Sequence, residues 1–184
     1  MATEPALSAP DLSPFSREKW KTRCLEVADY VIDVLSRQVM SWWMNREGWP
    51  SRSPFGTMVG PKVMLINMYA GSGGDWLPWM FQRRKLGPLV GTRTWGGLVG
   101  ISGYPPLMDG GGVTAASFGV MDETGHWAVE NVGVTPDVEV APMPTDVVAG
   151  RDPQLEKAVA LALEALERDG PPPAPPAYQP PTPR

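Results

Sequence analysis

One junction in the middle of the chain limits the folds that this sequence can adopt. The apolar run at residues 63–68 has the length of a strand buried on both faces, and residues 75–86 have the apolar spacing of a helix that Gly87-Pro88 ends. Between them stands AGSGGD, residues 70–75, whose small residues allow the backbone to come close to a neighbour. A strand that leads directly into a helix predicts a sheet with helices packed on it.

The remaining segments continue this alternation of strands and helices, so we assign the α/β class and find no internal repeat. A helix is predicted over residues 28–35, with one face formed by Tyr30, Val31, Val34 and Leu35. Short strands between glycine-rich turns are predicted at residues 89–92, 112–116, 118–121, 127–129 and 138–140. The last helix starts at Asp152 as N-cap, and its predicted buried stripe is Leu155, Ala158, Val159, Ala162, Leu163 and Leu166.

Charge and composition exclude several classes of function. The formal net charge is -4, and the 16 lysines and arginines are scattered, which argues against a nucleic-acid partner. Cys24 and His126 are the sole cysteine and histidine, so we expect no disulfide framework, no metal site and no cofactor. We find no signal peptide or membrane span, and we therefore expect no membrane partner and a cytoplasmic location.

The composition divides the chain into three parts. Residues 1–26 form a divergent or disordered N-terminal segment, and residues 27–168 form the folded domain. Residues 169–184 end in PPPAPPAYQPPTPR, which cannot bury an apolar core and lacks many backbone N–H donors. We predict a solvated extension there, with a polyproline ligand as the alternative.

Ser72 is the candidate nucleophile of the AGSGGD turn. A serine in a tight glycine turn at a helix N-terminus resembles a nucleophile elbow, and the N–H of Gly73 would then be an oxyanion donor. A plain structural turn is the alternative, since Ala70 replaces the first glycine of the usual elbow pattern. A phosphate cradle is excluded because no Lys-Ser or Lys-Thr pair follows the glycines.

A general base for Ser72 is harder to find. His126 stands in the turn-like segment DETGHWAVE, four residues before Glu130, and is best explained as an exposed loop histidine. Lys62 and Lys85 are the nearest lysines in sequence, but nothing around them indicates an activated amine.

Four motifs in a fixed order connect the chain to a known family. They are GTRTWGG, DGGGVTA, VENVGVTPDVEV and GRDPQLEKA, and they follow the AGSGGD turn. With these motifs the chain resembles the carboxy-terminal half of the catalytic region of the tricorn proteases, within the C-terminal processing serine peptidases. The resemblance covers the chain from about Ala28 and implies a crotonase/ClpP-like ββα core that is truncated on its N-terminal side.

The resemblance also implies roles for individual residues. Ser72 matches the nucleophile, in a segment that usually reads Ser-Asp-Gly-Asp and here reads Ser-Gly-Gly-Asp. Glu130 matches the carboxylate that orients the catalytic histidine through a serine. The matching part of the substrate groove is formed by Thr94, Trp95, Gly96 and Gly97. As the alternative, Trp95 belongs to the core and the glycines turn the chain.

The departures from the family pattern matter equally. The family's histidine, its supporting serine and a glycine-rich segment that supplies the second oxyanion N–H have no counterpart, and SREKWKTRCLEV stands where the glycine-rich segment would be. Whether this chain is an enzyme alone is therefore open. Sheet surface beside residues 63–68 is expected to be uncovered, which predicts marginal folding or self-association.

Three functions follow as hypotheses. The first is a serine peptidase domain that cleaves short peptides once a complementary chain supplies the histidine, within a homo-oligomer. The second is a catalytically inactive fragment that binds peptides along residues 94–97. The third is an assembly module that uses its tryptophan-rich surfaces and its proline tail.

Overall fold

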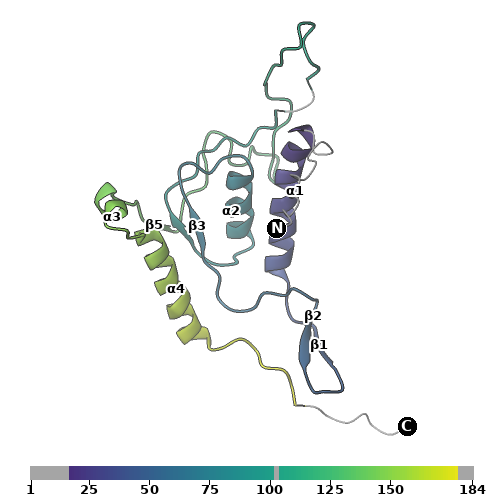
Figure 1. Ribbon diagram of the computed structural model, residues 1–184, viewed down its shortest axis with the longest axis vertical. Helices are drawn as coiled ribbons and strands as arrows, with labels where there is room; N and C mark the ends of the chain where they lie inside the picture. Colours follow the sequence, from purple (N-terminus) through teal and green to yellow (C-terminus); the bar gives the residue numbers. More distant parts are fainter. Residues whose placement is uncertain (1–16, 102–103, 178–184) are drawn as a thin grey trace, which may run out of the picture.

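The computed structural model describes residues 17–101 and 104–177, with side chains from residue 27 onward. Helix and strand alternate as the class assignment predicts (Figure 1). In chain order the elements are α1 (Arg17–Ser36), β1 (Ser41–Met44), β2 (Pro50–Ser53), β3 (Met64–Ile66), α2 (Gly73–Arg83), β4 (Leu89–Gly91), β5 (Val138–Glu139), α3 (Pro144–Val148) and α4 (Pro153–Asp169).

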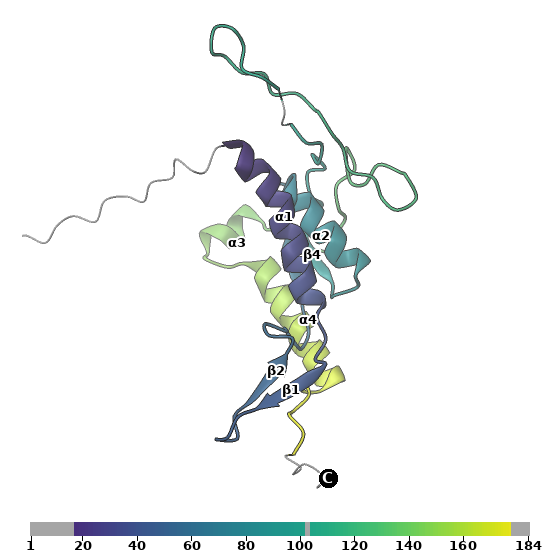
Figure 2. The ribbon, with the colours of Figure 1, turned by 90° about the vertical axis from the view of Figure 1, so that its right-hand side faces the viewer.

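A small parallel sheet lies at the centre of the fold. Its strand order is β3-β4-β5, while β1 and β2 form a separate antiparallel hairpin. Helix α2 packs between this sheet and α1, and α4 contacts β3 and β4 from the other side (Figure 1). The turned view shows the hairpin extending away from this layered part (Figure 2). The α2 N-terminus follows β3, as the sequence predicts.

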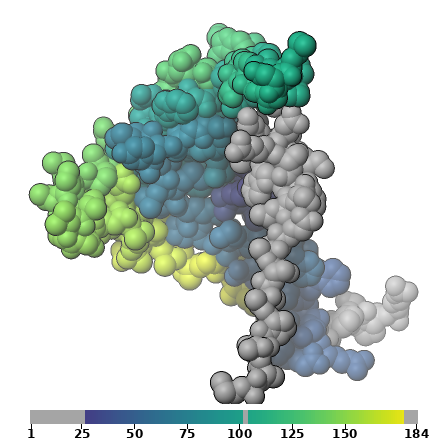
Figure 3. Space-filling model, turned by 45° about the horizontal axis from the view of Figure 1, so that its top comes forward, coloured from purple at the N-terminus to yellow at the C-terminus, as the bar shows by residue number. Residues whose placement is uncertain are grey.

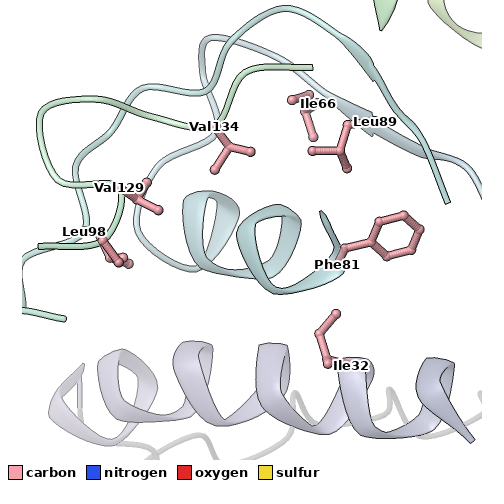
Figure 4. Close-up of a cluster of buried hydrophobic side chains, with 8 residues drawn as sticks. Ile32, Ile66, Phe81, Leu89, Leu98, Val129 and Val134 are labelled. Atoms are coloured by element: carbon pink, nitrogen blue, oxygen red, sulfur yellow. The ribbon is translucent and has the colours of Figure 1, made fainter. Parts of the chain in front are cut away.

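The core joins α1, α2, the sheet and the loop before β5. Phe81 of α2 is almost completely buried, and Ile32 of α1 faces α2 from the opposite side (Figure 4). The buried cluster consists of Ile32, Ile66, Phe81, Leu89, Leu98, Ala128, Val129 and Val134. Burial of one such large apolar side chain is worth about 1.5–3 kcal/mol, so this cluster fixes α2 against the sheet.

The predicted face of the first helix is right only in part: Leu35 packs against the core cluster and Val31 and Val34 are half-buried. Ala28 and Ile32 are its buried residues, whereas Tyr30 is 65% exposed. The helix also begins at Arg17, within the predicted N-terminal segment; residues 1–16 lie outside the described part. Ala28 and Ile32 are one turn apart, and these smaller side chains let α1 approach α2 closely.

The predicted start of the last helix is confirmed, but its predicted stripe is wrong. The Asp152 side chain accepts a hydrogen bond from the Leu155 N–H, and Pro153 occupies the first turn. Of the predicted stripe only Ala158 is buried, and Leu155, Val159, Leu163 and Leu166 are exposed. A sheet of three short strands covers only part of an apolar helix face this wide.

Strand β3 differs from the predicted strand buried on both faces. It lies at the edge of the sheet, and its central Leu65 is 42% exposed while Ile66 is buried. An apolar run alone does not distinguish a central strand from an edge strand, because both have the same sequence pattern.

The predicted strands at residues 112–116, 118–121 and 127–129 do not form a sheet. In their place Gly100 bridges Phe118 and Met121 bridges Trp127, and residues 112–116 form a loop. In the space-filling view the described part of this region protrudes at the top, away from α3 and the start of α4 (Figure 3). Of the described helices none has the length and apolar character to cross a membrane.

Candidate active site

Ser72 occupies a strained and exposed turn at the N-terminus of α2. Its backbone angles are φ 54° and ψ −115°, in a region that L-residues other than glycine rarely adopt. Backbone outliers of this kind cost about 1–3 kcal/mol and persist only where surrounding contacts enforce them. Here the Ser72 N–H donates to the Gly97 carbonyl at 2.8 Å, and the Ser72 carbonyl accepts the Asp75 and Trp76 N–H groups at 2.9 Å.

The N–H of Gly73 is suited to receive a negative charge. The N–H groups of Gly74, Asp75 and Trp76 all bond to backbone carbonyls, whereas the Gly73 N–H has no bond within the described part of the chain. It lies in the first turn of an 11-residue helix, whose positive dipole end adds to its attraction for an oxyanion.

Asp75 is the site residue that sequence reasoning missed. Its side chain is completely buried, and its two oxygens accept the N–H groups of Gly96 at 2.8 Å and Gly97 at 3.0 Å. Asp75 thereby fixes residues 95–97 to the turn that carries Ser72. The available signal was an acidic residue three positions after the serine, which sequence reasoning treats as an ordinary first-turn residue of a helix.

The four predicted groove residues have unequal surroundings. Thr94 is fully buried, and its Oγ1 accepts the Val134 N–H at 2.7 Å, so its side chain supports the fold and does not face a ligand. Trp95 is 68% exposed, which excludes the alternative that it belongs to the core. The backbone N–H of Trp95 donates to the carbonyl of Ala70, two residues before Ser72, at 2.9 Å.

The glycines of this segment do more than turn the chain. A β-carbon at Gly71 or Gly97 would lie 2.6 Å from the Trp95 ring, so both glycines allow the indole to cover the backbone beside Ser72. Gly96 has φ +86°, and a β-carbon there would lie 2.6 Å from the Gly133 nitrogen. The close approach of these backbones places the exposed Trp95 ring next to the turn that carries Ser72.

Glu130 is anchored through one oxygen. Its Oε2 accepts the N–H groups of Leu98 at 2.6 Å and Val99 at 2.9 Å. Its neighbours Val129 and Asn131 both have positive φ values, and the Asn131 N–H donates to the Gly96 carbonyl. The second oxygen, Oε1, has no bond within the described residues and can accept one from a further group.

His126 has its own local partners. Its Nδ1 lies 2.7 Å from Thr124 Oγ1, and its backbone N–H donates to Asp122. The hydrogen bond from the Thr124 side chain, followed by that from the His126 backbone, lowers the pKa of Asp122 to about 2. The prediction of an exposed loop histidine is confirmed.

Neither lysine is placed to activate Ser72. Lys85 follows the C-terminus of α2, so the length of this 11-residue helix, about 16 Å, separates it from the turn at the N-terminus. Lys62 precedes β3 and donates to the Gly60 carbonyl, at the end of the strand opposite to Ser72.

The sequence from α1 to β5 decides the family. Residues 28–140 match the family described as Peptidase family S41, a range that includes Ser72, Asp75 and Glu130. The chain belongs to this peptidase family. Its matched region is a domain of the serine peptidase type, and the tricorn resemblance of its motifs is confirmed by the relatives below.

Relatives of this chain within Peptidase family S41 are named as tricorn proteases. Tricorn protease homolog 1 of Streptomyces coelicolor is 43% identical over 137 residues, which are 74% of this chain and 13% of the relative. Tricorn protease of Thermoplasma acidophilum is 37% identical over 140 residues, 76% of this chain and 13% of the relative. This S41 chain therefore spans only a small part of the length of these curated relatives.

A solved structure agrees in fold. The crystal structure of the tricorn protease aligns with a TM-score of 0.72 and 37% identity, over 77% of this chain and 14% of that chain. The arrangement of helices and strands around Ser72 is therefore that of a tricorn-type S41 peptidase domain.

Proposed function

We propose that this chain supplies the nucleophile and the orienting carboxylate of a tricorn-type serine peptidase site. The observation that carries the proposal is the exposed, strained Ser72 beside the Gly73 N–H at the start of α2. Ser72 is the nucleophile, Gly73 an oxyanion donor and Glu130 the orienting carboxylate. The core around them is of the crotonase/ClpP-like ββα type, within residues 27–168.

The reaction proceeds by acyl transfer. Ser72 Oγ attacks the carbonyl carbon of a peptide bond as its proton passes to an imidazole, and the resulting oxyanion accepts the Gly73 N–H. The imidazolium then protonates the leaving amine as the C–N bond breaks. Water hydrolyses the ester in the same way, which returns the proton to Ser72.

The imidazole comes from outside the residues that surround Ser72. His126 is the sole histidine of the chain and is engaged in its own turn. A complementary chain or segment therefore delivers the histidine, and Glu130 Oε1 accepts a hydrogen bond from the group that holds it. The completed sites would assemble further into a homo-oligomer, and short peptides would bind beside Trp95, Gly96 and Gly97.

The test is labelling with a fluorophosphonate probe, read as intact mass. The chain alone should label very slowly, because loss of the base in such a unit removes on the order of 10⁶ in rate. Addition of a chain that carries a histidine half of a tricorn-type domain should give one probe per serine chain. Ser72→Ala should abolish this labelling, and the exposed Ser117→Ala should leave it unchanged. Equal labelling of the Ser72→Ala chain would contradict the assignment.

A second function is favoured by the bonding of His126 within its own turn. Without a base, the same surface would bind peptides without hydrolysing them. Ser72→Ala should then retain peptide affinity, and Trp95→Ala should weaken it about tenfold, which fluorescence anisotropy with a labelled short peptide measures. Rapid stoichiometric labelling of the isolated chain would overturn this alternative.

A further inference from the structure

The β1–β2 hairpin has a surface that the peptidase site does not use. It pairs Ser41–Met44 with Pro50–Ser53 and extends away from the buried cluster (Figure 2). On one side, Trp42 and Phe55 line a hollow of ≈ 560 Å³. Aromatic residues that line such a hollow form the type of surface that proline-rich segments bind.

The chain's own C-terminal segment also lines this hollow. After Gly170 ends α4, residues 171–176 read PPPAPP and carry no charge. Residues 172–175 line the same hollow as Trp42 and Phe55. Both ribbon views place this segment beside the hairpin (Figures 1 and 2).

Two further hollows are lined by the two ends of the segment 171–176. Residues 171–173 line one together with Pro61 and Pro88. Pro172 is half-buried, whereas the other five residues of 171–176 are exposed. A β-carbon at Gly60 would lie 3.6 Å from Pro172 Cγ, which is an ordinary packing distance. Pro175 and Pro176 line another together with Met44 and Arg46 of the hairpin. Six extended residues span about 19 Å, enough to follow a four-residue strand and its turn.

Arg52 adds the polar component of such a site. Its guanidinium lies over the Trp42 ring, 5.5 Å from the ring centre. Its Nε is buried and has no hydrogen-bond partner within the described residues. Residues 172–175 line the same hollow without bonding to this donor, and a proline carbonyl would satisfy it once the segment packs against Arg52.

We propose that the Trp42 side of the hairpin is a polyproline-binding groove and that its occupant is the C-terminal segment 171–176 of the same chain. The segment thereby links the end of α4 to the β1–β2 hairpin. The groove selects an uncharged, extended, proline-rich ligand through Trp42, Phe55 and the Arg52 donor. This inference is independent of the peptidase reaction at Ser72.

The first experiment uses the full chain labelled with 5-fluorotryptophan and ¹⁹F NMR. Substitution of the five prolines among residues 171–176 by serine removes the ligand without a change in the hairpin. The Trp42 signal, assigned with Trp42→Phe, should shift, whereas the signal of Trp49, which does not line these hollows, should not. An unchanged Trp42 signal would overturn the proposal.

The second experiment measures binding of the synthetic peptide PPPAPPAYQPPTPR. It should bind the proline-to-serine chain and bind the unmodified chain about tenfold more weakly, because the tethered segment competes at a high effective concentration. Trp42→Ala in the proline-to-serine background should weaken binding about tenfold relative to Trp49→Ala. Arg52→Lys gives a second variant that retains the charge but loses the Nε donor.

Three results would contradict the proposal. Equal binding to the Trp42→Ala and Trp49→Ala chains would place the peptide elsewhere. Equal binding to the unmodified and proline-to-serine chains would show that the segment does not occupy the groove. A Trp42 shift that depends on protein concentration, together with a dimer in sedimentation, would assign the occupant to a second copy instead.

Discussion

At the scale of single residues, Asp75 holds the turn that carries Ser72 to the segment 95–97 beside it. Asp75→Ala leaves the buried N–H of Gly96 and the half-buried N–H of Gly97 without acceptors, and a buried group of this kind costs about 1–3 kcal/mol. We expect a loss of roughly 2–4 kcal/mol in the free energy of unfolding, measured with urea. Asp75→Asn keeps one acceptor and should lose less. The exposed Asp109→Ala is the control and should change stability by less than about 0.5 kcal/mol.

Gly96 tests the close approach of backbones beside Ser72. Gly96 and Gly110 have similar φ values, +86° and +81°, but a β-carbon meets the Gly133 nitrogen only at Gly96, whereas the space at Gly110 is open. Gly110→Ala should cost about 1 kcal/mol from backbone strain, and Gly96→Ala at least twice as much because of the added clash. Urea unfolding of both variants measures the difference. Equal losses would show that the Gly133 backbone yields.

These residues also show how far sequence reasoning reaches. The turn at Ser72 was predictable because small residues between a strand and a helix have few other uses. Asp75 was not, since its role depends on Gly96 and Gly97, more than twenty positions later in the chain. The exposure of Trp95 was equally hidden, because the same residue type suits a core and a surface.

At the scale of elements, α4 separates local from non-local information. Its start follows from Asp152 and Pro153, which act within one turn. Which part of its wide apolar face is buried depends on the number of strands beneath it. We expect Leu163→Glu to change the free energy of unfolding by less than about 0.5 kcal/mol, and Ala158→Glu to cost more than about 2 kcal/mol. Urea unfolding measures both variants. Similar losses of unfolding free energy would show that Leu163 is buried, as the sequence predicts.

At the scale of the whole molecule, β3 leaves one edge of the parallel sheet without a partner strand in the described part of the chain. Edge strands with apolar residues pair with other chains, so the isolated protein should self-associate with rising concentration. Leu65→Lys places a charge on this edge and should shift sedimentation velocity profiles toward the monomer, while Leu155→Lys on α4 should not. A monomer with a sharp, concentration-independent melting transition would contradict this expectation. The complementary chain proposed for the histidine would then need another docking surface. The β3 edge is the expected one, because β3 is the strand that leads to Ser72 and a strand added beside it would lie near that serine.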